Sequence, residues 1–342
     1  MSLITMGHGA GGSQMEELIS RFRSVLKSDY LDQGLDSALL PPVAGALAFT
    51  TDSFVVKPLF FPGGDIGRLA VCGTVNDLSV VGARPLFLSS ALILEEGFPL
   101  EDLDRVLASM AEAAREAGVQ VVTGDTKVVE KGRGDGIYIT TAGVGALREG
   151  LDLSGAAIRE GDILLVSGSL GDHAMTILSL RESLGFASSL RSDCAPLNGL
   201  VAALIDSGAC PVFMRDLTRG GLAAALCELA DLRRLSLEID EEALPLRDEV
   251  RSMGELLGID ALTMANEGKI LVVVPRDKAE SALAALREQP LGREARAIGR
   301  VALVAGAAAG AADGAAGVRM RTVSGGVRRV TRPYAEKLPR IC

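Results

Sequence analysis

The sequence predicts an α/β protein built from two domains. Its 342 residues amount to about twice a common domain length. Apolar residues make up 48% of the chain and charged residues 23%, so a large core can be buried. Apolar runs typical of strands alternate along the chain with amphipathic helical patterns, and this alternation is the signature of an α/β architecture.

The first half opens with a glycine-rich segment that leads into a helix. Gly7–Gly12 predicts a mobile loop, and apolar residues at three- and four-residue spacing predict a helix over 14–27. Ser13 is expected to cap this helix, with Glu16 completing a capping box. The next elements expected are a strand at 46–51, a helix at 66–81, an apolar run at 86–94, a helix with its apolar face from Leu103 to Ala117, and strands at 119–122 and 136–144.

The second half begins after a polar, glycine-bearing stretch at 148–162, where we place the domain boundary. Strands are expected at 163–166 and 270–274, and helices at 221–232 and 278–287. The Ala/Gly stretch 305–317 predicts a turn between strands without a function of its own. The expected divisions are the glycine loop and helix at 1–40, an N-terminal domain at 41–150, a C-terminal domain at 151–330 and a tail at 331–342.

Composition argues against several classes of protein. A net charge of −9 and the absence of tryptophan argue against a nucleic-acid partner. No long apolar run predicts a membrane span, and no secretory signal is visible. Five cysteines without paired spacing, and only two histidines, argue against a disulfide framework or a zinc cage and suit a reduced cytoplasmic compartment. Cys72, Cys194, Cys210 and Cys227 are expected to be ordinary buried thiols. Cys342, the last residue of the sequence, is the one cysteine to which this expectation does not apply.

Three aspartates each follow an apolar run, namely Asp52, Asp77 and Asp125. Ligands of α/β proteins bind at the carboxyl ends of strands, and carboxylate oxygens gathered there suit Mg²⁺. The run before Asp77 is more typical of a helix than of a strand. Aspartates after strands are also common turn residues, so a purely structural role stays open.

Residues 214–221 open the helix expected at 221–232. Paired glycines at a helix N-terminus free backbone N–H groups for an anion, and Arg215 and Arg219 add guanidinium donors. Asp216 lies within the same segment. A capped helix with solvated arginines is the alternative.

Glu267 directly precedes the strand expected at 270–274, where a carboxylate suits a general base or a partner of a metal ligand. A turn residue is the plainer interpretation. The two histidines, His8 and His173, both fall in glycine-rich segments, and a surface-loop histidine is the simplest expectation for each.

Eight short motifs occur in order along the chain: Gly7–Gly12, Thr51–Ser53, Phe60–Gly64, Asn76–Asp77, Gly124–Val128, Gly171–His173, Arg215–Gly221 and Asn266–Lys269. The chain ends in Pro339–Cys342. Taken together, these motifs resemble the HypE family of hydrogenase maturation factors, a set of carbamoyl dehydratases within the ATP-using superfamily of aminoimidazole ribonucleotide synthetase and selenophosphate synthetase. The C-terminal motif is typical of HypE rather than of its superfamily relatives.

The resemblance implies an α/β (α+β) fold of the aminoimidazole ribonucleotide synthetase type. Its N-terminal α/β domain forms a β-barrel with a second copy, and a C-terminal α/β sandwich and a flexible tail follow. It also implies that ATP drives dehydration of an S-carbamoyl group on Cys342 to a thiocyanate, which supplies cyanide ligands for nickel–iron hydrogenase. The implied partners are the carbamoyltransferase HypF, the HypC–HypD iron-scaffold complex and a second copy in a homodimer.

The resemblance also implies roles for individual residues. Glu267 is the expected base, Lys127 the group that polarises the carboxamide oxygen, and His173 a residue that orients the tail. Twelve residues from Thr331 span at most about 40 Å, which lets Cys342 reach its own cleft. The expected Mg²⁺ ligands are Asp52, Asp77, Asp125 and Asp216. The residues expected to bind ATP are Gly9, Gly11, Gly12, Asp52, Phe60, Asn76, Asp77, Thr126, Arg215, Arg219, Gly220 and Gly221.

Two alternatives remain at this point. One is a synthetase of the same superfamily that acts on a small molecule, which the terminal cysteine disfavours. The other is a non-enzymatic maturation scaffold, which the nearly complete set of acidic and arginine motifs disfavours. A C-terminus that ends in cysteine by chance is the corresponding alternative for the tail.

Overall fold

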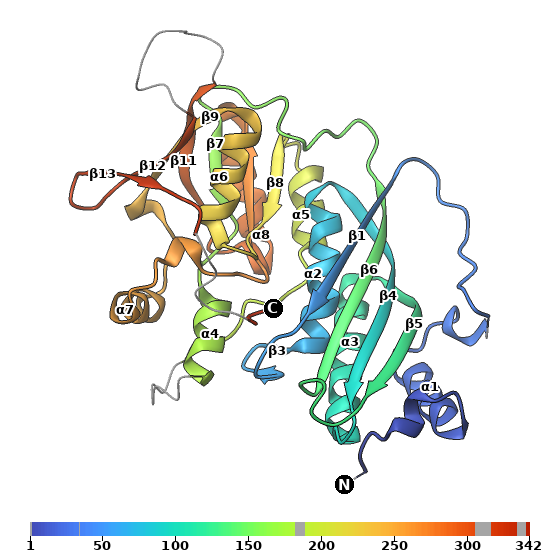
Figure 1. The fold of residues 1–342 in the computed structure, drawn as a ribbon. Coiled ribbons are helices and arrows are strands. Elements are labelled where there is room, and N and C mark those ends of the chain that lie inside the picture. The colour runs from blue at the N-terminus through green and yellow to red at the C-terminus, as the bar shows by residue number, and fades with distance from the viewer. Residues whose placement is uncertain (1, 34, 182–188, 305–315, 334–339) are drawn as a thin grey trace.

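The computed structural model describes residues 2–33, 35–181, 189–304, 316–333 and 340–342 (Figure 1). The chain folds around a four-stranded sheet in its first half and a seven-stranded sheet in its second half. Within the described residues, the C-terminus lies between the two sheets, near helix α4. No helix in these ranges is both long and apolar enough to cross a membrane.

The N-terminal sheet has the strand order β1-β6-β4-β5, with β1 and β5 at its two edges. Strands β4 and β5 are parallel and are joined by helix α3, while β1 and β4 pair antiparallel with β6. Side chains alternate along each strand, so one face packs on α2 and α3. The opposite face leaves Phe49 on β1 and Ile93 on β4 exposed to solvent. These elements are β1 (Leu47–Phe54), α2 (Ile66–Val80), β4 (Ala83–Glu95), α3 (Leu100–Ala117), β5 (Gln120–Val129) and β6 (Ile137–Leu147).

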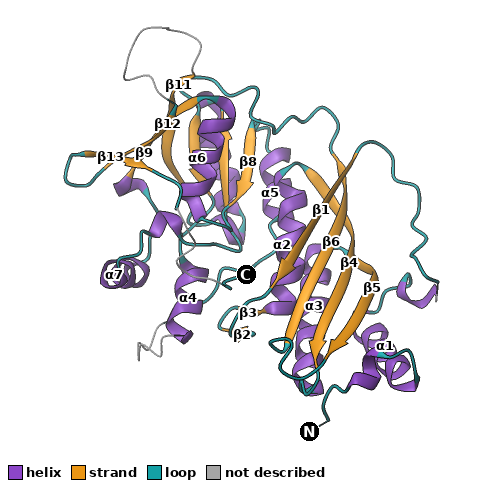
Figure 2. Cartoon of the chain, viewed as in Figure 1, coloured by secondary structure: helices purple, strands orange, loops and turns teal. Residues whose placement is uncertain are grey.

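The C-terminal sheet has the order β13-β12-β9-β11-β7-β10-β8 and carries helices on both faces (Figure 2). Alternate residues of its central strands enter two different cores: Leu271 and Val273 pack with α6, whereas Ile270 and Val272 pack with α5 and α8. These elements are β7 (Ile163–Val166), α5 (Asn198–Asp206), β8 (Phe213–Asp216), α6 (Gly221–Arg233), β9 (Leu235–Asp240), β10 (Ile270–Val274), α8 (Ala279–Glu288), β11 (Arg296–Val304), β12 (Gly317–Arg321) and β13 (Val327–Val330).

The remaining elements lie around the two sheets. Helix α1 packs on α3, and α4 packs on α7 and on β2. Their bounds are α1 (Ser13–Leu26), α4 (Asp172–Arg181), α7 (Asp248–Leu257), β2 (Phe60–Phe61) and β3 (Gly64–Asp65), with short 3-10 turns η1 (Met6–Gly9), η2 (Leu31–Gln33), η3 (Glu241–Ala243), η4 (Ala261–Thr263), η5 (Arg276–Lys278) and η6 (Pro290–Gly292).

Helix α2 connects the two halves of the molecule. It contacts β1, β6 and α3 on one side and β8 and α5 on the other. Its residues are apolar or small around nearly the whole circumference, as expected for a helix buried on every side. Asp65 caps the helix by accepting the N–H groups of Gly67 and Arg68 at 2.8 and 3.0 Å. Because α2 contacts β8 and α5, polar residues of this helix such as Asn76 lie against the second half of the chain.

The predicted α/β class is confirmed, and every element expected from periodicity is present with ends shifted by up to seven residues. Several local expectations are wrong. Strands β1 and β5 continue through Asp52 and Asp125, so these side chains project from a sheet face instead of following a strand end. Ser13 is the first helical residue and Gly12 occupies the N-cap, without a side-chain hydrogen bond. Residues Met6–Gly9 form a 3-10 turn within the expected loop.

The expectations for three single side chains are wrong, and the expectation for one segment cannot be compared with the structure. Cys210 is exposed, whereas Cys72, Cys194 and Cys227 are buried as expected. Neither histidine is a surface residue: His8 is buried in η1, and His173 is buried in the first turn of α4. Of the Ala/Gly stretch 305–317, residues 305–315 lie outside the described part of the chain.

Candidate active site

A cleft of about 1080 Å³ lies between the two halves of the molecule. Strand β1 and helix α2 form one wall, and strand β8 and helix α6 form the other. Asp52 and Asp77 line the first wall, and Asp216 lines the second together with Arg215 and Arg219. Three of the aspartates that the sequence singled out therefore meet here.

Local structure sets the position of each carboxylate. Asp77 lies near the end of α2 and accepts a hydrogen bond from Thr50 Oγ1 of β1 at 2.8 Å. Asp52 faces the same helix at Gly73, where a Cβ would come within 3.9 Å of Asp52 Oδ2. Asp216 is the last residue of β8, opposite Ile270 of β10.

The three carboxylates repel one another. Burial, with the charges of Asp77 and Asp52, raises the pKa of Asp216 to about 7. Burial and the charge of Asp77 also raise the pKa of Asp52, against the opposing charge of Arg219. The pKa of Asp77 is raised by burial. A divalent cation fits this set because it would relieve the repulsion.

The carboxylates do not form a ready-made cage. Among the described residues, no group of three or more His, Cys, Asp or Glu side chains is close enough to hold a metal ion. Mg²⁺ typically keeps several waters and takes only one or two carboxylates together with phosphate oxygens. The cleft fits a magnesium ion that arrives with a phosphate ligand.

The second wall supplies positive groups. Arg215 pairs with Glu228 of α6 at 2.5 Å, and Arg219 is exposed at the helix start. Gly220 and Gly221 adopt left-handed φ values of 70° and 58°. At Gly221 a Cβ would lie 2.3 Å from the carbonyl oxygen of Met264, so only glycine fits there. The cleft is therefore lined by a helix N-terminus and two arginines, which favour an anion.

Glu267 is buried, with 2% of its surface exposed, and lies close enough to Asp216 and Asp52 for their charges to act on it. Its Oε1 has no hydrogen-bond partner among the described residues. Burial raises the pKa of Glu267 well above its usual value, and the charges of Asp193, Asp216 and Asp52 add to the effect. A carboxylate that binds a proton this readily suits a general base.

Asp193, which the sequence analysis missed, organises the segment that carries Glu267. Its carboxylate accepts the backbone N–H groups of Glu267 and Gly268 at 3.1 and 3.2 Å, and it forms a buried ion pair with Lys269 at 3.2 Å. The positive charge of Lys269 and the hydrogen bond from the Glu267 N–H hold the pKa of Asp193 below its usual value in spite of burial. No sequence signal marks Asp193, because its partners lie more than 70 residues away.

The end of the chain lies in a seat beside β1. The backbone N–H of Val55 donates to the carbonyl of Cys342 at 3.2 Å, and the N–H of Lys57 donates to the carbonyl of Arg340 at 3.3 Å. Ile341 is buried in a core cluster to which both halves of the chain contribute, and Cys342 packs against that cluster. Residues 340–342 are thus bound to the chain's own surface, whereas residues 334–339 of the predicted tail lie outside the described part.

His173 contacts this seated end directly. Its Nε2 lies 2.7 Å from the carbonyl oxygen of Ile341, and its Nδ1 lies 2.8 Å from Ser192 Oγ. Burial lowers the pKa of His173, so the ring is neutral. Because a carbonyl oxygen only accepts, Nε2 carries the proton and Nδ1 accepts from Ser192. The predicted orienting histidine lies against the tail.

Other predicted residues lie away from the cleft. Asp125, Thr126 and Lys127 are on β5, at the sheet edge opposite Asp52, and Lys127 pairs with Asp125 at 2.7 Å. This pairing lowers the pKa of Asp125. Gly9 packs against Val128 of the same strand, while Gly11 and Gly12 are exposed beside it. Within one chain, this β5 group does not meet the acidic cleft.

Two residues expected to bind ATP have internal partners instead. The Asn76 amide donates to the carbonyls of Ala195 and Glu267 at 3.1 and 3.2 Å and accepts the N–H of Leu197 at 2.7 Å. It therefore positions Glu267 rather than facing the cleft. Phe60 lies under the guanidinium of Arg105, with its ring centroid 3.7 Å away.

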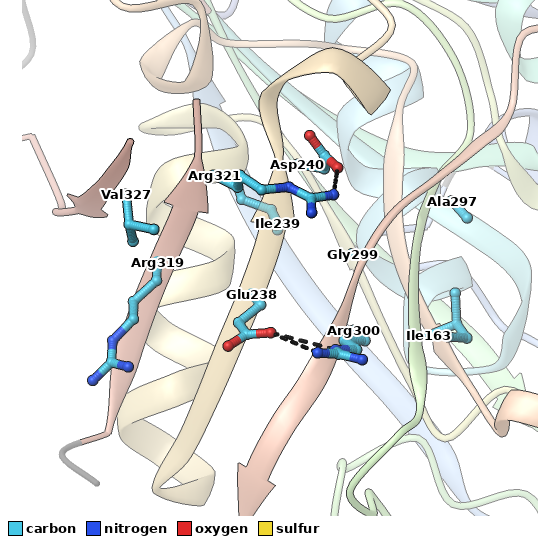
Figure 3. Close-up of a pocket in the computed structure, with 10 residues that line it drawn as sticks. All are labelled: Ile163, Glu238, Ile239, Asp240, Ala297, Gly299, Arg300, Arg319, Arg321 and Val327. Carbon is cyan, nitrogen blue, oxygen red and sulfur yellow. Dashed lines mark hydrogen bonds and ion pairs between the residues drawn. The ribbon is translucent and has the colours of Figure 1, made fainter. Parts of the chain in front are cut away.

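A second hollow of about 540 Å³ lies on the C-terminal sheet and does not share the chemistry of the cleft (Figure 3). Four of its charged side chains form neighbouring pairs across the strands, Arg300 with Glu238 at 3.1 Å and Arg321 with Asp240. Two acid–arginine pairs offset their charges here, whereas the cleft brings three carboxylates together opposite two arginines. The interdomain cleft is the better candidate active site.

The chain is similar to known proteins along nearly its whole length. The chain matches the AIR synthase related protein, N-terminal domain, over residues 34–147 and the corresponding C-terminal domain over residues 159–306. It is 51% identical over 340 residues to carbamoyl dehydratase HypE of Azotobacter vinelandii, covering 99% of this chain and 97% of that protein. A crystal structure of hydrogenase maturation protein HypE in complex with ATP is similar at a TM-score of 0.93, with 46% identity over 99% of each chain. A chain of a HypE–HypF complex is similar at 0.79, with 48% identity over 94% of this chain and all of that one.

Proposed function

The chain belongs to the HypE carbamoyl dehydratases of the AIR synthase related superfamily, and we propose on this premise that it uses ATP to dehydrate a carbamoyl group carried on its own Cys342. The product is S-cyanocysteine, which supplies cyanide ligands to the iron centre of nickel–iron hydrogenase. Three observations carry the proposal: an acidic, arginine-lined cleft, a buried glutamate whose Oε1 has no hydrogen-bond partner among the described residues, and a C-terminal cysteine held against the chain's own surface.

The reaction removes the elements of water from a thiocarbamate. The carboxamide oxygen attacks the γ-phosphorus of ATP and ADP leaves, which converts a poor leaving group into phosphate. Both N–H protons then leave nitrogen, the second as the C–O bond breaks and the carbon–nitrogen triple bond forms. The products are the S-cyano group, ADP and phosphate.

Glu267 is proposed as the base that takes a proton from nitrogen. Its Oε1 is unpartnered among the described residues, so it can accept a proton without first breaking a hydrogen bond. Asn76 and Asp193 hold its backbone in place through the contacts described above. A carboxylate whose pKa is raised accepts a proton more readily than an ordinary one, which suits this role.

The cleft is proposed to hold the nucleotide as its magnesium complex. Asp52, Asp77 and Asp216 would hold Mg²⁺, either directly or through the waters that the ion keeps, and Arg215 and Arg219 would face the phosphates. When bound, the ion would neutralise triphosphate charge and the charge that develops on the transferred group. The left-handed Gly220 and Gly221 present the start of α6 to the same ligand.

A second copy of the chain is proposed to complete the site. Asp52 and the β5 group lie on opposite, unpaired edges of one sheet, whose open face exposes 72% of Phe49. Two such sheets that pair edge to edge would form a closed barrel, bury Phe49 and bring Asp125, Lys127 and Gly9–Gly12 of one copy to Asp52 of the other. This arrangement gives the β5 group the site that it lacks within one chain.

The remaining assignments follow from the family. The carbamoyl group is proposed to come from a carbamoyltransferase of the HypF type, since a solved HypE–HypF complex contains a similar chain. The HypC–HypD complex is the proposed acceptor of the cyano group, and the cytoplasm, where thiols stay reduced, is the proposed location. The divisions 1–40, 41–150, 151–330 and 331–342 remain part of the proposal.

Mass spectrometry of the C-terminal peptide tests the function. The protein is incubated with HypF, carbamoyl phosphate, ATP and Mg²⁺, with parallel samples that lack ATP or contain a chelator. We expect a carbamoyl adduct on Cys342 that loses one water only when ATP and Mg²⁺ are both present. An adduct that never loses water would show that the chain is not the dehydratase. Loss of water in the chelated sample would contradict the magnesium assignment alone.

A further inference from the structure

The seated C-terminus is held by a side-chain contact that the dehydration chemistry does not use. Arg340 forms an ion pair with Asp135, and its Nε donates to the carbonyl of Val55 at 3.0 Å. Asp135 lies between β5 and β6, in a segment far from the cleft aspartates along the chain. The side chain of Arg340, the third residue from the end, thus connects the tail to the N-terminal domain.

The backbone of Arg340 is shaped for this contact. Its φ of 57° lies in the left-handed region, which is uncommon for a residue with a Cβ and persists only where surrounding contacts hold it. The turn sends the guanidinium back to Asp135 while the carbonyl accepts from the Lys57 N–H and from Arg181. The conformation places Ile341 under His173 and brings Cys342 to Val55.

We propose that Asp135 is a specificity-determining residue that recognises Arg340, holds the tail in register in its seat and thereby limits access to the Cys342 thiol. The seat itself rests on the observed contacts, and its use in the reaction rests on the proposed function. Release of the Asp135–Arg340 pair would let the tail leave the seat. The Cys342 thiol has to become accessible in this way before a separate enzyme can modify it.

The charged groups around Asp135 favour an arginine at position 340. Lys57 Nζ also donates to Asp135, at 3.2 Å, yet only the Lys57 backbone contacts the tail. Arg181 donates to a tail carbonyl, and His173 is neutral. Among these neighbours, Asp135 is the group whose charge complements the Arg340 side chain.

Alkylation of Cys342 by iodoacetamide measures seat opening without ATP or a partner protein. The reagent is uncharged, and proteolysis after Glu336 yields a peptide that reports Cys342 separately from the exposed Cys210. Partly exposed ion pairs stabilise by up to about 1 kcal/mol, so Asp135→Asn and Arg340→Gln should each raise the Cys342 rate by about two- to fivefold. Lys57→Gln is the matched control and should leave the rate within about twofold of wild type.

The pair of variants separates seat opening from a simple effect on thiol ionisation. Removing the negative charge of Asp135 would favour the thiolate and removing the positive charge of Arg340 would disfavour it, so ionisation alone moves the two rates in opposite directions. We expect both to rise, and the exchanged pair Asp135→Arg with Arg340→Asp to return toward the wild-type rate. Opposite shifts, unchanged rates or failure of the exchange would overturn the proposal. Because the assay contains no ATP, these outcomes are independent of whether dehydration occurs.

Discussion

Replacing Glu267 with glutamine removes the proposed base while keeping the shape of the side chain. The residue is 2% exposed, and its backbone is held by Asn76 and Asp193, so the Glu267→Gln variant should keep the same local fold. General bases accelerate reactions by about 10²–10⁴-fold. We therefore expect dehydration to slow by that factor, which is about 3–5 kcal/mol in the activation free energy.

The same substitution should stabilise the fold. The pKa of Glu267 is raised in the folded protein from an ordinary value of 4.5, so the folded state holds the proton more tightly than the unfolded chain does. The ionised form therefore costs folding free energy, and this cost grows as pH rises above 4.5 until it levels off above the folded pKa. Glutamine cannot ionise, so the stability gain of Glu267→Gln should grow with pH.

Two measurements on one preparation test both parts. Single-turnover dehydration of pre-carbamoylated protein gives the rate, and thermal unfolding across a pH series gives the stability. Calorimetric titration with ATP should show an affinity within about twofold of wild type, because Glu267 is not among the residues proposed to bind the phosphates of ATP. Glu160→Gln, an exposed glutamate on the second domain, is the matched control and should change neither quantity.

Particular outcomes would refute this reasoning. A Glu267→Gln variant that dehydrates at the wild-type rate cannot have lost the base. A variant that is slow because it no longer binds ATP would place Glu267 in the nucleotide site instead. A stability difference that does not depend on pH would contradict the raised pKa.

Three other predictions address the cation and the dimer. Because the pKa of Asp216 is about 7, the affinity for Mg²⁺ with ATP, measured by calorimetry, should increase as pH rises through that value. Asp216→Asn should weaken binding and remove this dependence on pH. A wild-type affinity that does not change with pH would contradict the assignment of Asp216 as a ligand. Phe49→Asp should convert a dimer into monomers in sedimentation, since two buried copies contribute about 3–6 kcal/mol, whereas Val323→Asp, also at an exposed apolar residue, should not. Mixing inactive Lys127→Ala and Glu267→Gln chains should restore about a quarter of wild-type activity if Lys127 acts across the dimer, and none if it acts within one chain.

Local periodicity predicted much of the fold because helices and strands are determined by neighbouring residues. The helix at 14–27 and the strand at 270–274 were found within one residue of their ends. Sheet order was not predictable in this way, since it depends on pairing between distant segments. The separation of Asp52 from Asp125 by the width of a sheet was therefore invisible in the sequence.

The candidate site was partly predictable for the same reason. Asp52, Asp77, Asp216, Arg215 and Arg219 were found through local motifs, and the structure brings them together. The roles of Asn76 and Asp193 arise from contacts across more than 70 residues, so a local motif cannot distinguish a ligand-binding side chain from one that supports Glu267.

His173 shows how burial reverses a sequence expectation. A glycine precedes Asp172 and suggests a loop, but the helix begins at Asp172 and the imidazole points into the protein. Its two nitrogens are satisfied by Ser192 and by the carbonyl of Ile341, which lies at the far end of the chain. Only the folded arrangement identifies it as part of the seat.

The most direct test of the account is whether Cys342 itself carries the product. Wild-type protein and the Cys342→Ala variant are each incubated with HypF, carbamoyl phosphate, ATP and Mg²⁺, and the C-terminal peptide is analysed by mass spectrometry. The account predicts an ATP-dependent S-cyano group on Cys342 of the wild type and no carbamoyl or cyano group anywhere on the variant. A wild-type Cys342 that stays unmodified, or a variant that still forms the cyano group, would contradict it.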